Sequence, residues 1–514
     1  MKKRFNVTGV CVPEMHYMVD ISEKINKIEE MVDYGSYFTI NRPRQYGKTT
    51  ALNALAKKLR EKYIVIKTSF EGVSDRMFES EEFFCSEIFS VFADSVEFID
   101  IELASVLRRH QREIDSYNTL SREITEMIKE IKKDVVLLID EVDKNSNNRT
   151  FLKFLGLLRN KYLARNSGED ITFQSVILSG VHDIKNLKLA IRDENDTRFN
   201  SPWNIAEDFR VNMSFSQLEI ESMLIEYCND TGIKFDTSSI SAMIFDYTSG
   251  YPYLVSQICK IIDERLEKRW DIPGVQAAVK DILNEKSTLF DDVMKNIQNN
   301  KDIRKTVYNL LIRGQSVTYN YDAYEKGIMY GLFAQNGGKL IIHNKIFEER
   351  IYNYLLEDEK LLEMSEGITQ VSISQFIEHG GLNMEKVLLK FQEFMYEEYR
   401  QEDERFYETH GRMIFLSFLK PILNGVGFRY VEPVTRQNKR MDLILTFNQK
   451  QYIVELKIWN GKKYEEKGIA QLCEYLDIHR HDTGYLLIFN FNSNKEPKAQ
   501  WIDVDSKKIF EVMV

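Results

Sequence analysis

The sequence predicts an α/β protein in which a parallel-sheet domain comes first, a helical region follows, and a second, smaller α/β domain ends the chain. Three observations carry this prediction. Short apolar strands alternate with amphipathic helices between residues 30 and 180, apolar residues at helical spacing mark residues 215–295, and strands return after residue 400. At 514 residues the chain exceeds what one hydrophobic core usually organises, so we expect about three domains.

The composition is that of a folded protein, with 43% apolar and 29% charged residues. Five cysteines occur without a C-x-x-C pair, which argues against a zinc ribbon or a disulfide scaffold and fits a reducing cytoplasm. The basic start is not followed by an apolar segment, and no apolar run approaches the length of a membrane span, so we expect a cytoplasmic protein without membrane association. The net charge of −10 argues against broad, non-specific nucleic-acid binding but permits a local basic groove.

The first domain is expected to contain βαβ units. Strands separated by helices imply parallel neighbours that are joined by crossover connections. We predict strands at residues 37–40, 63–68, 135–139 and 174–178, and a helix over residues 49–62.

The middle of the chain is predicted to be helical up to about residue 295 and then to change character. Two further helices, 303–312 and 321–330, are expected. Strands over 332–335 and 339–343 follow and meet at a Gly-Gly turn, which is typical of a winged-helix module. A charged helical stretch, 384–408, leads to the last domain. The predicted boundaries are 1–215, 216–296, 297–357, 358–400 (a helical connector) and 401–514.

Residues 41–50 have the features of a phosphate-binding loop between a strand and a helix. Backbone N–H groups at a helix N-terminus bind phosphate, assisted by the helix dipole. Lys48 is placed to reach the β and γ phosphates, and Thr49 to hold Mg²⁺. The usual pattern begins with glycine six residues before the lysine, and here that position is Arg42. The predicted nucleotide-binding residues of this loop are Arg44, Gln45, Tyr46, Gly47, Lys48, Thr49 and Thr50.

A second motif, at residues 135–141, is a buried strand that ends in two acids. At the C-terminal end of a strand, Asp140 can hold Mg²⁺ through water, and Glu141 can polarise the attacking water. The alternative is a solvated strand end, where aspartate is common. The two motifs occur in the right order on the right elements, which favours an ATP site with Thr49 and Asp140 as magnesium ligands.

These motifs resemble those of bacterial AAA-like ATPases of the STAND-related group, over roughly residues 5–355. The similarity rests on the segments 8–9 and 16–20, on the loop Arg-Pro-Arg-Gln-Tyr-Gly-Lys-Thr, and on the Asp-Glu pair at 140–141. Loops with Arg-Pro-Arg at this place are common in that group. The resemblance implies a P-loop parallel-sheet ATPase core that carries a helical lid and a winged helix.

The same resemblance implies roles for residues beyond the two motifs. The segment Gly-Tyr-Pro-Tyr-Leu at 250–254 is similar to a Gly-x-Pro element whose proline, here Pro252, packs near the adenine. A γ-phosphate sensor would fall at Ser179 or His182, and Arg198 would be an arginine finger.

The C-terminal domain contains two predicted strands, 439–446 and 452–458, joined by a turn. Period-two geometry puts Glu455 and Lys457 on one face, and a hairpin that aligns the faces would bring Asp442 beside them. Two carboxylates and a lysine suit phosphodiester hydrolysis. Asp442 and Glu455 would hold Mg²⁺ or Mn²⁺, and Lys457 would orient or neutralise the reacting groups. The alternative is an exposed hairpin with a cross-strand ion pair.

The order of these residues resembles the PD-(D/E)XK nuclease superfamily, which implies a restriction-endonuclease-like α/β fold. The next helix carries Gln471 and Tyr475 in a Gln-x-x-x-Tyr pattern similar to the RecB-like branch, which implies a catalytic role for Gln471. The core helix of the superfamily often supplies another acid, here Glu408 or, as second candidate, Glu404. Residues 436–467 hold eight Lys/Arg against four Asp/Glu, a basic rim that fits a nucleic-acid backbone.

The leading hypothesis is a nuclease that binds and hydrolyses ATP and cuts nucleic acid, DNA favoured, under control of the ATPase module. A role in defence or mobile-element biology follows by analogy only. A hypothesis of another class is an ATP-dependent signalling switch whose C-terminal domain binds nucleic acid or a partner without cutting. The expected cofactors are ATP and Mg²⁺, with Mn²⁺ an alternative at the nuclease site. A homo-oligomer is an expectation by analogy with ring-forming ATPases.

Overall fold

The computed structural model describes most of the chain, and its residues divide into two compact units. Unit 1 comprises Met1–Thr237, Gly250–Ser256 and Met329–Gly331; unit 2 comprises Ser238–Ser249, Gln257–Ile328 and Leu332–Val514. Residues outside the description are 1–2, 112–113, 143–147, 182–202, 204, 312–315, 357–372, 399–407, 424–426, 431–442, 448–449, 460 and 491–497.

Unit 1 is built on a four-stranded parallel sheet with the strand order β1-β4-β3-β2. The strands are β1 (Phe38–Asn41), β2 (Ile64–Ser69), β3 (Val135–Asp140) and β4 (Ser175–Gly180). Each observed strand lies within two residues of its predicted bounds. The predicted α/β fold with a parallel sheet is therefore confirmed for this unit.

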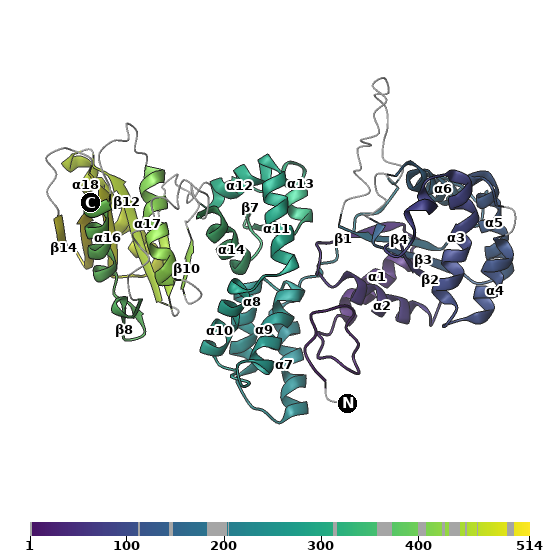
Figure 1. Cartoon of the computed structure of the whole chain (residues 1–514), viewed down its shortest axis with the longest axis horizontal. Coiled ribbons are helices and arrows are strands. Elements are labelled where there is room, and N and C mark those ends of the chain that lie inside the picture. The colour runs from purple at the N-terminus through teal and green to yellow at the C-terminus, as the bar shows by residue number, and fades with distance from the viewer. Residues whose placement is uncertain are drawn as a thin grey trace, which may run out of the picture. The chain divides into compact units, whose positions relative to one another are not determined.

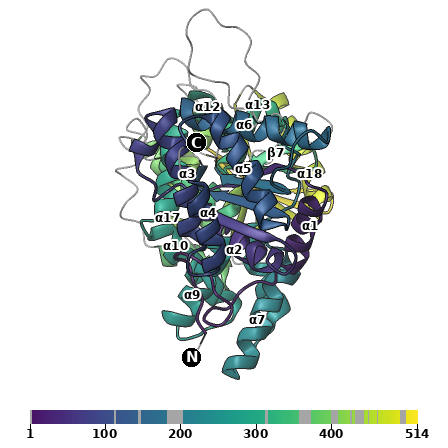
Figure 2. The same cartoon turned by 90° about the vertical axis from the view of Figure 1, so that its right-hand side faces the viewer.

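Helices pack around this sheet (Figures 1 and 2). They are α1 (Ser22–Asp33), α2 (Lys48–Leu59), α3 (Glu81–Val96), α4 (Ile101–His110), α5 (Tyr117–Ile131) and α6 (Arg149–Asn166). The unit also contains α7 (Gln217–Thr231). The starts of α3, α4, α5 and α6 are capped by side chains that accept backbone N–H bonds. The capping residues are Ser80, Asp100, Ser116 and Asn148.

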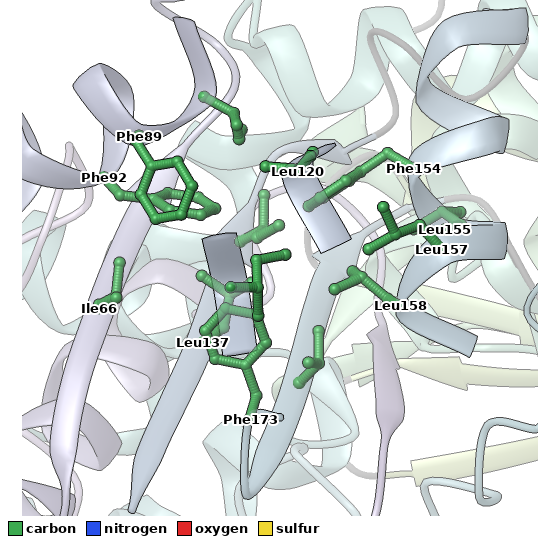
Figure 3. Close-up of a cluster of buried hydrophobic side chains, with 14 of the residues drawn as sticks. Ile66, Phe89, Phe92, Leu120, Leu137, Phe154, Leu155, Leu157, Leu158 and Phe173 are labelled. Carbon is green, nitrogen blue, oxygen red and sulfur yellow. The ribbon is translucent and has the colours of Figure 1, made fainter. Parts of the chain in front are cut away.

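The core of unit 1 lies between one face of the sheet and helices α3–α6 (Figure 3). Val135, Leu137 and Ile139 of β3 belong to this cluster, and Phe89 and Phe92 of α3 pack in it. Because strand side chains alternate, the intervening residues of β3 point to the opposite face, and they are fully buried as well. A strand that is buried on both faces explains the unbroken apolar run in the sequence.

The first part of unit 2 is helical and ends in a small antiparallel sheet with the order β5-β7-β6. The helices are α8 (Thr237–Thr248), α9 (Pro252–Glu264), α10 (Ile272–Asn284), α11 (Thr288–Asn299), α12 (Lys301–Leu311), α13 (Tyr321–Met329) and α14 (Lys345–Leu356). Three of them share residues with unit 1, which includes the first residue of α8, the start of α9 and the last residue of α13. The strands are β5 (Val317–Thr318), β6 (Phe333–Asn336) and β7 (Lys339–Ile342). Gly337 and Gly338, between β6 and β7, have φ values of 54° and 80°, which glycine tolerates at a tight turn. The helices and strands predicted for this region are present, and their assignment to a winged-helix module remains a prediction.

The rest of unit 2 contains a six-stranded mixed sheet with the order β10-β11-β12-β13-β15-β14. The strands are β10 (Gly427–Tyr430), β11 (Leu443–Phe447), β12 (Lys450–Ile458), β13 (Thr483–Phe489), β14 (Lys498–Val504) and β15 (Lys507–Met513). A short hairpin, β8 (Ile377–Glu378) and β9 (Gly381–Leu382), precedes α16 (Met384–Glu398), α17 (Glu408–Leu423) and α18 (Lys462–His479).

Helices pack on both faces of the six-stranded sheet. Leu472 and Leu476 of α18 share a cluster with Ile453 and Leu486, while Phe391 of α16 contacts Phe489 on the other face. The helix α16 thus packs on the sheet, although we predicted that it belongs to a connector. Within the described parts of the chain, no helix is both long and apolar enough to cross a bilayer.

Candidate functional site

The predicted phosphate loop joins β1 to α2. Gly47 occupies the N-cap position of α2 with a φ of 78°, and Gln45 also has a positive φ, 57°. Because glycine has no side chain, the first-turn N–H groups of α2 receive no side-chain cap from the N-cap residue. An uncapped helix start behind a tight loop is suited to bind an anion such as phosphate.

The ammonium of Lys48 lies inside this loop. Its Nζ donates hydrogen bonds to the carbonyl oxygens of Arg42 and Pro43, each at 3.0 Å, and the residue is only 7% exposed. Backbone oxygens thus hold the side-chain nitrogen of Lys48 beside the start of α2, where the positive end of the helix dipole also lies.

Thr49 and Asp140 meet across the loop. Thr49 Oγ1 donates to Asp140 Oδ2 at 3.0 Å, and Asp140, at the end of β3, is 3% exposed. The other oxygen of Asp140 accepts the N–H of Glu141 at 3.0 Å. Glu141 has a φ of 54°, an uncommon conformation for a non-glycine residue that often marks a functional position. A hydroxyl and a carboxylate at this distance can both serve as oxygen ligands of Mg²⁺.

Arg42, at the position of the usual first glycine, is anchored by its own side chain. Its guanidinium donates to the carbonyl oxygens of Asn41 and Val211, each at 2.7 Å, and lies over the ring of Phe209. The side chain thus ties the start of the loop to the segment that precedes α7. No motif in the sequence marks Val211 as the partner.

The Gly-Tyr-Pro segment also reaches the loop. The hydroxyl of Tyr251 donates to the carbonyl of Arg44 at 2.7 Å, and the rings of Tyr251 and Tyr46 meet edge to face at 4.7 Å. A Cβ placed on Gly47 would lie 3.9 Å from Cβ of Pro252. The structure therefore brings Pro252 close to the phosphate loop, and its predicted place beside the adenine stays a prediction.

Two contacts of the loop region were not foreseen from the sequence. The N–H of Cys11 donates to Thr50 Oγ1 at 3.2 Å, so the N-terminal segment lies on the first turn of α2. The hydroxyl of Tyr46 bonds to that of Ser214, and burial raises the pKa of Tyr46. Both contacts join residues far apart in the sequence, so no local sequence pattern predicts them.

Of the two candidates for the γ-phosphate sensor, Ser179 and His182, the structure describes only Ser179. Ser179 lies near the end of β4, in register with Ile40, and its buried Oγ has no hydrogen-bond partner among the described residues. A buried hydroxyl that lacks a partner is costly and fits a ligand-facing position. His182 and Arg198 lie outside the part of the chain that the structure describes.

In the C-terminal sheet, Glu455 of β12 is fully buried, and its Oε1 lies 2.8 Å from Nζ of Lys457. Glu455 and Lys457 share the face that α18 covers, since Ile453 at the same parity belongs to the α18 cluster. A Cβ added to Gly468 of α18 would lie 3.3 Å from Cγ of Lys457, so the helix approaches the stem of this lysine closely.

The other predicted nuclease residues are placed only in part. Gln471 is half-buried and Tyr475 buried on α18, which packs against β12 and β13. Asp442 and Glu404 lie outside the described residues; Glu408 begins α17, but its side chain is not described. Among the residues that can be described, no group of three or more His, Cys, Asp or Glu could hold a metal ion.

A second buried carboxylate lies on the same face of this sheet. Glu511 of β15 is fully buried, and Lys498 Nζ lies 2.6 Å from both Glu511 and Glu465. Through Leu486 of β13, Glu511 and Glu455 occupy one row across the sheet. Burial raises the pKa of Glu511. Glu465, Lys498 and Glu511 were not predicted as a group from the sequence, because they lie far apart in the chain.

A model of the AAA-like domain family matches residues 13–353. Similar solved structures include a Walker-type ATPase of Pyrococcus abyssi, with 15% identity over 68% of this chain and 99% of that chain and a TM-score of 0.44. Others are the Aeropyrum pernix ORC1 protein in complex with DNA (13% identity, 67% and 94% covered, TM-score 0.30) and a mutant of Thermotoga maritima RuvB (13%, 66% and 96%, 0.33). No curated protein matches the sequence. Since the family model spans more than half of the 514 residues, this chain belongs to the AAA-like domain family, and its phosphate loop is of the ATPase type.

Proposed function

We propose that this protein binds and hydrolyses ATP at the phosphate loop and uses the nucleotide to control a metal-dependent nuclease in its C-terminal domain. The observation that carries the nuclease part is the fully buried Glu455, paired with Lys457 on β12. The observation that carries the ATP part is the grouping of Lys48, Thr49 and Asp140 at the end of the parallel sheet.

The phosphate-loop residues suit ATP and Mg²⁺. Lys48 would bind the β and γ phosphates, and the first-turn amides of α2 would donate to their oxygens. Thr49 and Asp140 offer two oxygen ligands to Mg²⁺, which would neutralise charge that builds up on the phosphates. Glu141 would accept a proton from, or orient, the water that attacks the γ phosphate.

The nuclease proposal rests on the cost of placing Glu455 where it is. A carboxylate with no exposed surface in the middle of a sheet is expensive even when it is ion-paired, and an apolar residue there would often be more stable. Ionisable residues held at such a cost are frequently functional. The antiparallel register pairs Leu443 with Val454. Asp442, the second acid that the proposed metal site needs, lies outside the described residues, and its place beside Glu455 is part of the proposal.

The chemistry follows from these groups. Glu455 and Asp442 would hold Mg²⁺ or Mn²⁺. The ion would activate a water molecule and stabilise the charge that develops on the phosphate in the transition state. Lys457, held within 2.8 Å of Glu455, would orient the water or neutralise the phosphate. Gln471, half-buried on α18, would position a group beside the scissile phosphate. DNA is the favoured substrate, and the basic segment 436–467 would contact its backbone.

The nuclease is tested by incubating plasmid DNA with the unaltered protein and with the Glu455→Gln variant, in Mg²⁺ or Mn²⁺. Glutamine keeps the shape of the side chain but removes its charge, so we expect the variant to lose cleavage by at least about 100-fold. Matched thermal unfolding curves control for folding. DNA binding without cutting by the unaltered protein would favour the second hypothesis, a switch that binds nucleic acid or a partner.

A further inference from the structure

The phosphate loop is contacted by a second turn, Met329–Gly331, which begins at the last residue of α13 and belongs to unit 1. Gly331 has a φ of +68°, and a Cβ added there would lie 2.5 Å from Cγ and 3.0 Å from Cβ of Pro43. Backbone conformation and available space therefore both require glycine at this position. The contact is made to a loop residue whose carbonyl is already bonded to Lys48.

Tyr251 lies beside the same contact. One of its ring carbons, Cε2, is 3.5 Å from the Cβ position of Gly331, and its hydroxyl donates to the carbonyl of Arg44. The backbone of the preceding residue packs tightly on Phe215, since a Cβ on Gly250 would lie 1.9 Å from the carbonyl oxygen of Phe215. The backbone of Gly250 also accepts the N–H of Phe215 at 2.8 Å. The loop is thus held by two segments that come from far along the chain.

The contacts converge on three consecutive carbonyls. Lys48 holds those of Arg42 and Pro43, and Tyr251 holds that of Arg44. A phosphate that draws the ammonium of Lys48 toward its own oxygens weakens the first two bonds. The backbone at Pro43 is then freer to move. Because Gly331 packs closely on Pro43, such a movement would shift Gly331 as well.

We infer that Tyr251 and Gly331 are positioning residues of the phosphate loop, and that nucleotide binding at the loop is coupled to the turn at residues 329–331. The inference rests on the proposed ATP site. Coupling of this kind is reciprocal: if nucleotide changes the turn, a change in the turn alters nucleotide affinity by the same factor.

A matched pair of glycine variants tests the coupling. Gly331→Ala adds a methyl group against Pro43, whereas Gly338→Ala adds one where nothing lies within 4 Å, at a similar positive φ of +80°. We expect Gly331→Ala to weaken binding of a fluorescent ATP analogue by about tenfold and Tyr251→Phe by several-fold, with Gly338→Ala close to the unaltered protein. Equal affinities for the two glycine variants would overturn the inference.

Hydrogen exchange on the unaltered protein gives a readout that does not depend on a substitution. We expect ATP to change the exchange rate of the amides at residues 329–331 by about fivefold or more, and to leave them unchanged in Lys48→Ala. Nucleotide binding without any change at the turn would overturn the coupling alone. If the unaltered protein failed to bind ATP in the titration, the proposed ATP site and the coupling would both be overturned.

Discussion

Thr49 Oγ1 donates a hydrogen bond to Asp140 Oδ2 at 3.0 Å, and this bond joins the first turn of α2 to the end of β3. The residues are 91 positions apart in the chain. They meet because the carboxyl ends of parallel strands share one edge of the sheet, where the loop after β1 also lies. Under the proposed function, the pair would offer two oxygen ligands to a nucleotide-bound Mg²⁺.

Replacing Asp140 with Asn should remove the magnesium dependence of ATP binding. The amide keeps the shape and can still bond to Thr49, but it loses the negative charge that attracts the cation. We expect the affinity for ATP in Mg²⁺ to fall by about tenfold and to become equal to the affinity in EDTA. Isothermal titration in the two buffers measures this. A variant that retains the full Mg²⁺ effect would show that Asp140 does not hold the ion.

Glu141 should matter for hydrolysis and not for binding. Glu141 directly follows β3 and has a φ of 54°, and it is the neighbour of Asp140, the proposed magnesium ligand. We expect Glu141→Gln to bind ATP as the unaltered protein does and to release phosphate at least about 100-fold more slowly, because glutamine cannot accept a proton from water. Phosphate release and nucleotide binding are measured on the same preparation. Unchanged hydrolysis would assign the base to another residue.

Lys161 should be a major determinant of the stability of unit 1. Its ammonium is 3% exposed and donates to Ser121 O, Thr125 Oγ1 and Asp170 Oδ2 at 2.9, 2.7 and 2.6 Å. We expect Lys161→Met to lower the free energy of unfolding by about 3 kcal/mol, because it leaves the partly buried carboxylate of Asp170 without its cationic partner. Urea unfolding provides the measurement.

The matched control for this variant is Lys129→Met. Lys129 makes an exposed ion pair with Glu126 at 2.9 Å, which should contribute less than about 0.5 kcal/mol. Similar losses for the two variants would contradict the assigned role of Lys161.

His343 should make unit 2 sensitive to acid. Burial lowers the pKa of His343 from 6.5 to about 4. Below pH 6.5 the histidine is protonated in the unfolded chain but stays neutral in the folded chain. The free energy of unfolding therefore falls as the pH drops from 6.5 to about 4, by up to roughly 3 kcal/mol. Above pH 6.5 the residue contributes no pH dependence. Unfolding of the unaltered protein and of His343→Gln across this range measures the effect, and parallel curves would refute it.

The parallel sheet was predictable because β3 is buried on both faces and leaves an unbroken apolar run in the sequence. The phosphate loop was predictable as well, since a helix that begins after Gly47 with Lys48 and Thr49 has a local signature. The same holds for Glu455 and Lys457, whose shared face follows from a period of two.

What the sequence did not yield depends on long-range contacts. The charged residues of α16 suggested a connector, but Val387, Leu388 and Phe391 are fully buried, so the helix belongs with the sheet. The approach of Gly331 to Pro43 and the grouping of Glu511 with Lys498 follow from tertiary folding, which single-element patterns do not encode. The nuclease fold, Asp442 as its second acid and the domain boundaries stay predictions.

The most direct test of ATP control is the rate of plasmid cleavage in Mg²⁺, with and without ATP, by the unaltered protein and by Lys48→Ala. We predict that ATP changes the rate of the unaltered protein by about tenfold and leaves Lys48→Ala at the rate measured without nucleotide. The same rate for both proteins, with or without ATP, would contradict control of the nuclease by the phosphate loop.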